Sequence, residues 1–154
     1  MLYLGSDHAG YALKEAVRRY LDEQGIRYTD LGTHSAESVD FCDYAFPVAE
    51  SVVREREQGH DALGILFCGS GIGMDIAANK VRGARAALAM TPYMGAQSRE
   101  HDNANILVLA GRILSEEQSI EILTAFLSAE FDGQENHARR MQKISDYEST
   151  HFTV

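Results

Sequence analysis

The sequence predicts a single α/β domain, in which helices cover both faces of a parallel sheet of five strands. Short apolar runs alternate with amphipathic stretches along the chain, which is the pattern of repeated strand–helix–strand units. The 154 residues, 45% of them apolar, suit one domain with a substantial core. No internal repeat, linker or shift in composition divides the chain. We therefore expect the domain over residues 1–147 and a frayed tail over residues 148–154.

Five short apolar runs, bounded by Gly, Asp or Asn, are expected to form buried strands. They are Leu2–Leu4, Ile26–Leu31, Leu63–Phe67, Ala84–Met90 and Ile106–Leu109. The first helix lies between the first two strands: apolar residues from Ala12 to Leu21 share one face, and Gly25 follows as a C-cap candidate. A second helix is expected over about Tyr44 to Gln58, and a third just after Gly73.

Two later helices carry clear start signals. Thr91 is the expected N-cap of the fourth helix, with Pro92 at its first position. Ser115 and Gln118 fit a capping box that begins the fifth, which should bury an apolar stripe of Ile120, Leu123 and Phe126. A last, basic helix carries His137, Arg139, Arg140 and Lys143, and its apolar residues Met141 and Ile144 are expected to turn inward.

Composition excludes several classes of function. The formal net charge of −9, from 14 basic and 23 acidic residues, argues against general binding to nucleic acid or to an anionic membrane. No apolar run approaches the ~20 residues that span a bilayer, and the first residues lack the basic region of a signal peptide. The two cysteines, Cys42 and Cys68, form no CxxC pair, so we expect neither a disulfide nor a zinc site, and a reducing, cytoplasmic setting.

Ligands of parallel α/β sheets bind beyond the carboxyl ends of the strands, so the residues after each strand are the candidates for chemistry. Gly69-Ser70-Gly71-Ile72-Gly73 lies between a strand and a helix start, where its backbone N–H groups can point at an anion. The run is neither a dinucleotide fingerprint nor a P-loop, because it reads GxGxG and no Lys-Ser/Thr pair closes it. Tight packing of strand on helix is the alternative explanation of its glycines.

Cys68 begins this turn, where a helix N-terminus is expected to lower the pKa of its thiol and make it a nucleophile or base. The alternative is that Cys68 is only a small buried side chain, and this is how we interpret Cys42.

His8 and His101 follow different strands, and we expect them to converge on Cys68 as acid and base. Arg112, after the last strand, is a candidate phosphate ligand. The remaining histidines before the last helix and in the tail (His34, His60, His151) are expected to be solvated, and no spacing of ligands indicates a metal site.

These motifs resemble those of the type B ribose-5-phosphate isomerases and their relatives, the galactose-6-phosphate isomerase subunits and allose-6-phosphate isomerases. The resemblance covers residues 1 to about 147. It rests on segments that occur in the family's order: Gly5-Ser6-Asp7-His8-Ala9-Gly10, residues 40–45, Cys68-Gly69-Ser70-Gly71-Ile72-Gly73, Ile76-Ala77-Ala78-Asn79-Lys80, Arg99-Glu100-His101, Asn105-Ile106-Leu107 and Gly111-Arg112.

The resemblance implies a Rossmann-like three-layer sandwich, no cofactor, and a homodimer or a tetramer with the site at the dimer interface. It implies that Cys68 moves a proton between C1 and C2 of a phosphorylated sugar, that Ser70 and the turn amides stabilise the enediolate, and that His101 opens the sugar ring. Substrate or phosphate contacts are implied for Asp7, His8, Gly69, Gly71, Ile72, Gly73, Asp102, Arg112, Asn136 and Arg140, with Arg140 supplied by the partner subunit. Some members use a Glu base just past the glycines; that position is Met74 here, which favours the cysteine variant.

Three positions depart from the family pattern. Asp102 replaces the usual Asn, Phe41-Cys42 replaces Tyr-Pro, and Asn136 stands where the family has a phosphate-binding Arg. The resemblance implies ribose 5-phosphate as the substrate, and these departures leave erythrose 4-phosphate, allose 6-phosphate and galactose 6-phosphate as alternatives. A non-catalytic phosphosugar-binding or nucleotide-binding module, and a subunit that needs a paralogous partner, are further alternatives.

Overall fold

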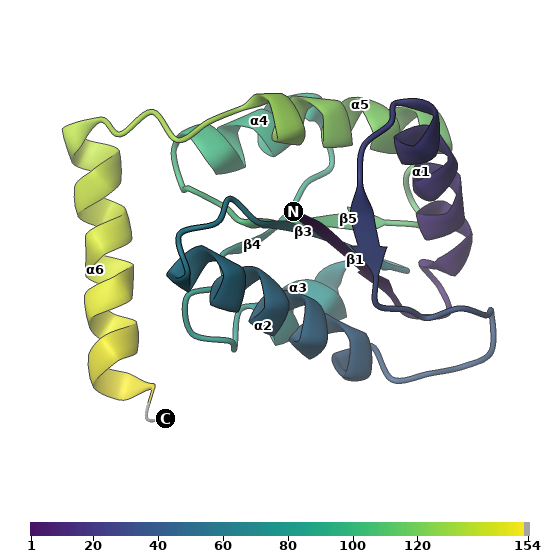
Figure 1. Ribbon diagram of the computed structural model, residues 1–154, viewed down its shortest axis with the longest axis horizontal. Helices are drawn as coiled ribbons and strands as arrows, with labels where there is room; N and C mark the ends of the chain where they lie inside the picture. Colours follow the sequence, from purple (N-terminus) through teal and green to yellow (C-terminus); the bar gives the residue numbers. More distant parts are fainter. Residues whose placement is uncertain (153–154) are drawn as a thin grey trace.

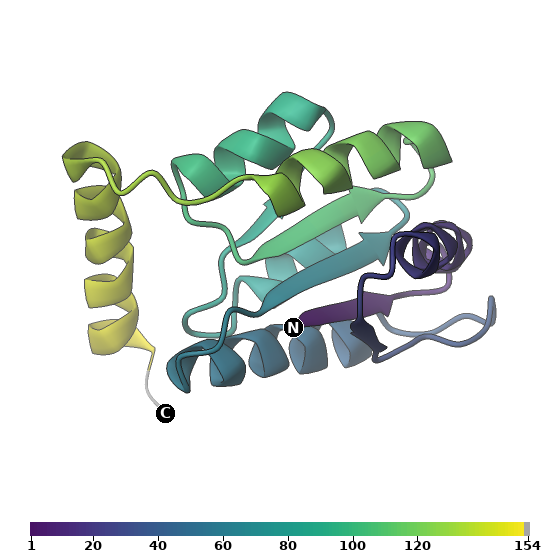
Figure 2. The same ribbon diagram turned by 45° about the horizontal axis from the view of Figure 1, so that its top comes forward.

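A computed structural model, which describes residues 1–152, has one parallel sheet of five strands in the order β2-β1-β3-β5-β4. Figures 1 and 2 show helices on both sides of the sheet, and in Figure 2 the arrows of β1, β3 and β5 run side by side in one direction. The single α/β domain and the positions of its five strands are therefore confirmed, with small differences at the strand ends. The strands are β1 (Leu2–Ser6), β2 (Tyr28–Asp30), β3 (Leu63–Cys68), β4 (Ala86–Leu88) and β5 (Ile106–Ala110).

Helices cover both faces of the sheet, and each face has its own apolar core. One face packs on α1 (Tyr11–Glu23) and α5 (Glu116–Ser128), with α4 (Pro92–Glu100) against α5. The other packs on α2 (Cys42–Glu57) and α3 (Ile72–Ala78). The central strands β3 and β5 are buried along their whole length, because they have neighbours on both sides and helices on both faces.

Both expected helix starts are confirmed. The Thr91 hydroxyl accepts the N–H of Met94 at 3.2 Å, and Ser115 and Gln118 form a complete capping box with bonds of 3.1 and 3.0 Å. Two details of the expected helices, the start of α3 and the inner face of α5, were wrong. Helix α3 begins at Ile72, earlier than expected, because Gly71 adopts a positive φ of 83° and turns the chain directly into the helix. The side chain of Ile120 is only half-buried, since the inner face of α5 is formed by Ser119, Ile122, Leu123 and Phe126.

The last helix, α6 (Glu135–His151), stands apart from the sandwich beside the amino ends of the strands (Figure 2). His137 is its one buried residue, and Ile144 is 45% exposed. The expectation that Met141 and Ile144 turn into the core was wrong, because α6 does not lie on the sheet. The tail was expected to fray after Tyr147; α6 continues as far as His151, and Thr153 and Val154 lie outside the described residues.

Among residues 1–152, the longest and most apolar helices fall short of what crossing a membrane requires.

Candidate active site

The carboxyl ends of β1, β3 and β5 bring Asp7, Cys68 and Arg112 to one edge of the sheet. Ser6 pairs with Phe67 and Cys68 pairs with Ala110, so the residues that follow each strand are neighbours. A close approach at Gly10 makes this possible. A Cβ atom there would lie 2.2 Å from the backbone carbon of Phe67, so only glycine lets the turn after β1 reach the end of β3.

The glycine turn after β3 places backbone amides beside the sulfur of Cys68. The backbone amides of Gly71 and Met74, at the start of α3, act to lower the pKa of the Cys68 thiol. The Ser70 side chain is exposed, and its hydroxyl accepts the N–H of Ile72 at 3.4 Å. The Arg112 side chain lies against Gly69, because a Cβ atom on Gly69 would be 3.2 Å from a guanidinium nitrogen of Arg112. A cation and several amide donors thus surround one turn, which is a suitable setting for an anionic ligand.

Cys68 is 7% exposed, and its thiol donates a hydrogen bond to Oδ2 of Asp7 at 3.2 Å. Burial, and then the hydrogen bond to Asp7, raise the pKa of the Cys68 thiol above its ordinary value, although the amides of Gly71 and Met74 act in the opposite direction. The expected lowering of this pKa was therefore wrong. The helix N-terminus is present, but burial of the sulfur, and then the Asp7 carboxylate beside it, outweigh its effect on the pKa.

His8 and Phe41 frame the same edge of the sheet. His8 is half-buried, and its Nδ1 accepts the N–H of Val39, so the neutral ring carries its proton on Nε2. The ring of Phe41 lies over the glycine turn, at 3.0 Å from where a Cβ atom on Gly73 would stand. This aromatic side chain therefore borders the site although it lacks a phenol.

His101 and Asp102 lie at the opposite edge of the sheet from Cys68. Helix α4 starts beyond the carboxyl end of β4 and runs back for nine residues, about 13 Å, so its end at His101 is beside the amino ends of the strands. Asp102 lines a cleft of about 440 Å³ there, between α6 and the first residues of β4. The expectation that His8 and His101 of one chain meet at Cys68 was wrong.

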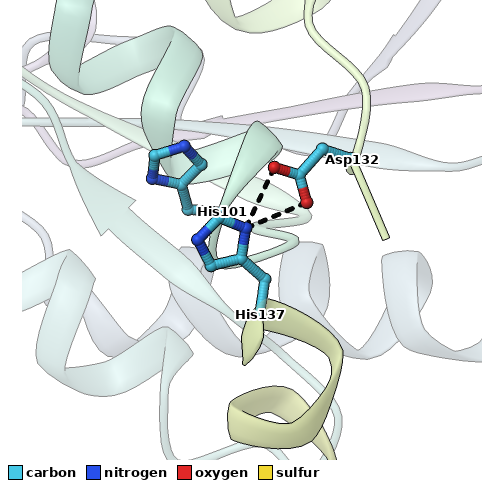
Figure 3. Close-up of side chains that lie close together, drawn as sticks. All are labelled: His101, Asp132 and His137. Atoms are coloured by element: carbon cyan, nitrogen blue, oxygen red, sulfur yellow. Dashed lines mark hydrogen bonds and ion pairs between the residues drawn. The ribbon is translucent and has the colours of Figure 1, made fainter. Parts of the chain in front are cut away.

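At this second edge, His101 stacks on His137, with ring centroids 4.2 Å apart and planes inclined by 25° (Figure 3). Both oxygens of Asp132 accept from Nδ1 of His137 at 2.9 Å, and this bond lowers the pKa of Asp132. Gln97 donates to Nδ1 of His101 at 3.2 Å, which leaves Nε2 of His101 for proton transfer. The sequence reasoning missed Asp132 and the burial of His137, because no local spacing links them to His101.

His101, Asp132 and His137 are also residue types that bind transition metals, and their ligand atoms lie within 4.8 Å of one another. The two rings face each other, however, whereas the lone pairs of imidazole nitrogens lie in the ring planes. The stack therefore does not direct both nitrogens at one point. Asn136 and Arg140 lie on α6, before and after His137, so they belong to the His101 edge as well.

The whole chain is similar to known sugar isomerases. Residues 2–144 match the family model described as Ribose/Galactose Isomerase. The crystal structure of a ribose 5-phosphate isomerase from Thermotoga maritima is 48% identical, covers 94% of this chain and 97% of its own, and superposes with a TM-score of 0.87. Ribose-5-phosphate isomerase B of Mycoplasma genitalium with bound ribulose 5-phosphate is 39% identical, covers 96% of this chain and 95% of its own, and has a TM-score of 0.89.

Ribose-5-phosphate isomerase B of Escherichia coli strain K12 is 38% identical over 94% of this chain and 93% of its own. The relatives thus share the length of the chain and its fold, and the family match includes both edges of the sheet described above. On this evidence, the chain belongs to the ribose/galactose isomerase family.

Proposed function

We propose that this chain interconverts ribose 5-phosphate and ribulose 5-phosphate by moving a proton between C1 and C2 through an enediolate. The observation that carries the proposal is the position of Cys68 at the start of the glycine turn, directly before α3 and beside the Arg112 side chain that lies against Gly69. A second support is the relative from Mycoplasma genitalium, which binds ribulose 5-phosphate and is 39% identical. The substrate supplies and regains the migrating hydrogen, so the proposed reaction requires no cofactor.

Each group at the Cys68 edge has a role that suits this chemistry. The Cys68 sulfur takes the proton from the carbon next to the carbonyl. The amides between Gly69 and Gly73 stabilise the oxyanion that forms, and aimed donors of this kind contribute about 3–4 kcal/mol each in other oxyanion holes. The Ser70 hydroxyl, at the mouth of the turn, carries a proton between the two oxygens of the enediolate.

The phosphate is held away from the reacting carbons. Arg112 lies over Gly69 at the same edge as Cys68, and a guanidinium binds phosphate through two donors. His8, which follows β1, and the backbone at Ile72, where α3 begins, lie at the same edge of the sheet and are further candidates for substrate contacts. Binding energy gained at the phosphate can then fix the sugar carbons beside the sulfur.

The remaining site residues require a second copy of the chain, so we propose a homodimer with the active site at its interface. His101, Asp102, Asn136 and Arg140 lie at the amino edge of the sheet, whereas Cys68 ends β3 at the carboxyl edge. In a two-fold dimer the same two surfaces meet twice, so the amino edge of one copy can face the carboxyl edge of the other. The partner then supplies His101 to open the ring and Arg140 to bind phosphate.

Two apolar surfaces favour such an interface. Tyr93 is 69% exposed and Ile113 is 60% exposed, and both lie just after the carboxyl end of a strand. Ile144 and Tyr147 on α6 are exposed at the other edge. Large apolar side chains gathered in this way are typical of surfaces that a partner covers.

An assay of the purified single chain in D₂O tests the function. Ribose 5-phosphate should be converted to ribulose 5-phosphate, with solvent deuterium incorporated at C1 of the product. Retention of the substrate hydrogen would indicate a hydride shift and exclude Cys68 as the base. Binding without turnover for every sugar phosphate would indicate a non-catalytic module or a subunit that needs a paralogous partner.

Asn136 favours a second candidate, an isomerase of another sugar phosphate. An amide stands in the first turn of α6 where the resemblance predicts a guanidinium, so one phosphate ligand is weaker. The same assay with erythrose 4-phosphate, allose 6-phosphate and galactose 6-phosphate separates the two candidates. If kcat/KM is higher for one of these sugars than for ribose 5-phosphate, that sugar phosphate is the substrate, and the proposal of a ribose 5-phosphate isomerase is rejected.

A further inference from the structure

Asp7 faces Cys68 because β1 and β3 are neighbouring strands whose last paired residues are Ser6 and Phe67. The Asp7 side chain is 5% exposed and is held on two sides. Its Oδ1 accepts the N–H of Gly10 at 2.8 Å, and its Oδ2 accepts the thiol of Cys68 at 3.2 Å. Both carboxylate oxygens are thus engaged by the protein, and one of them is aimed at the sulfur.

The hydrogen bond runs from the thiol of Cys68 to Oδ2 of Asp7, so the thiol carries the proton of this bond, and burial and Asp7 both favour the protonated thiol. A protonated thiol cannot take a proton from carbon, so a reaction that uses Cys68 as a base must first move this proton. Among the other titratable groups nearby, Arg112 lies over Gly69, and Cys42 and Tyr44 of α2 pack in the same apolar cluster as the sulfur. Asp7 is the group that accepts the thiol hydrogen bond.

We propose that Asp7 is a positioning residue that receives the Cys68 proton when a sugar phosphate binds, an inference that rests on the proposed function. The thiol proton passes to Oδ2, which leaves a thiolate and a neutral Asp7. The thiolate takes the proton from C2 of the aldose, and the electron pair of that bond moves to the carbonyl oxygen as the enediolate. After the hydroxyl proton moves between the two oxygens, the Cys68 thiol protonates C1, and Asp7 returns its proton to the sulfur.

This series of proton transfers conserves protons and charge within the site. The pair carries one negative charge before the reaction, the enediolate carries it in the middle, and the pair regains it at the end. The N–H groups of Gly71 and Met74 stabilise the thiolate while Asp7 is neutral. The proton therefore has an acceptor inside a buried site, where exchange with solvent is restricted.

The first test measures the Cys68 thiol without any sugar, in the full chain carrying Cys42→Ser. The rate of alkylation by iodoacetamide is followed against pH. The midpoint should lie above about 8.5, the value of an ordinary thiol. Asp7→Asn removes the neighbouring charge, so the midpoint should fall by about one pH unit and the rate at pH 7 should rise about tenfold.

Asp75→Asn is the matched control. Asp75 lies in the first turn of α3, close to the glycine turn, but does not bond the sulfur. Its replacement should leave the alkylation midpoint unchanged. An equal shift in Asp7→Asn and Asp75→Asn, or no shift in Asp7→Asn, would overturn the role of Asp7.

The second test measures kcat against pH. With Asp7 present, kcat for ribose 5-phosphate should be constant between about pH 7 and 9, because the acceptor is internal. In Asp7→Asn the thiol must lose its proton to solvent, so kcat should no longer be constant but should rise tenfold per pH unit below the thiol pKa. A raised KM with a flat kcat profile would instead make Asp7 a substrate ligand and would refute the inference.

The two tests separate this inference from the proposed function. Alkylation needs no substrate, so a shifted midpoint in a chain that isomerises no sugar phosphate would reject the function alone. An unshifted midpoint in an active isomerase would reject the Asp7 role alone. If Asp7→Asn does not fold, the test is made on the Cys42→Ser chain. An alkylation midpoint at or below that of an ordinary thiol, or a kcat that rises with pH, would overturn the role of Asp7.

Discussion

Nδ1 of His137 donates a bifurcated hydrogen bond to both carboxylate oxygens of Asp132, each at 2.9 Å. The bond joins the segment before α6 to the first turn of α6. Because this bond lowers the pKa of Asp132, the ionised carboxylate stabilises the fold. That contribution is complete above the unfolded value, about pH 4, and is lost as the pH falls through the lower folded value. The contribution of the Asp132–His137 bond to the free energy of unfolding therefore depends on pH.

Asp132→Asn should lower the urea midpoint of unfolding at pH 7, and the difference from the unsubstituted chain should shrink below about pH 4. Glu130→Gln, an exposed substitution in the same segment, should show no such pH dependence. The prediction is wrong if the Asp132→Asn chain is destabilised equally at pH 7 and at pH 3.

Mixing two inactive variants should restore activity. A dimer of one Cys68→Ala chain and one His101→Ala chain has one site with both residues intact, so a 1:1 mixture that has exchanged subunits should recover about a quarter of full activity. Each variant alone should be inactive on ribose 5-phosphate. A mixture that stays inactive after subunit exchange, shown by mass spectrometry, would place both residues in the same chain's site.

Cys68→Ala should reduce kcat for ribose 5-phosphate by about a thousandfold, because it removes the carbon base. The circular dichroism spectrum should be unchanged, since alanine fits the buried end of β3. Cys42→Ala is the control and should keep activity within a few fold, because this half-buried thiol is in α2. An active Cys68→Ala chain would rule out the sulfur as the base.

Asn136→Arg should lower the KM for ribose 5-phosphate about tenfold, since a charge-assisted bond to phosphate contributes about 1.5–3 kcal/mol. Asn136→Gln lengthens the side chain without adding charge and should leave KM near that of the unsubstituted chain. If the two variants have the same KM, position 136 does not contact the phosphate.

Gly10→Ala should destabilise the fold by about 3 kcal/mol or more, because its Cβ would lie 2.3 Å from the carbonyl oxygen of Phe67. Gly133→Ala is the control, with a positive φ of 64° and no atom within 4 Å of the added Cβ, so it should cost about 1 kcal/mol of backbone strain alone. Chemical denaturation measures both. Equal losses would show that the contact at Gly10 relaxes freely.

Local patterns in the sequence were sufficient to predict the sheet and most helices. Thr91 and Ser115 cap their helices as expected, because a cap is a contact between residues three positions apart. The alternation of apolar runs and amphipathic stretches likewise predicted a parallel sheet covered on both faces. The glycine turn after β3 was recognised because its spacing and its place at a strand end are both visible in the sequence.

Contacts between distant segments were not predictable in this way. The direction of α4 carries His101 to the amino edge of the sheet, and the stack on His137 joins residues that no spacing relates. Helix α6 has an amphipathic pattern but does not lie on its own sheet, so its apolar residues were wrongly expected in the core.

The amino-acid sequence by itself determined the α/β class, the glycine turn and the presence of a thiol at its start, because these depend on neighbouring residues. The tertiary structure alone decided the state of that thiol. The register of β1 against β3 sets Asp7 beside Cys68 at a buried strand end. Burial of the sulfur, and then the carboxylate at hydrogen-bond distance, raise the pKa of the thiol that a helix N-terminus would lower.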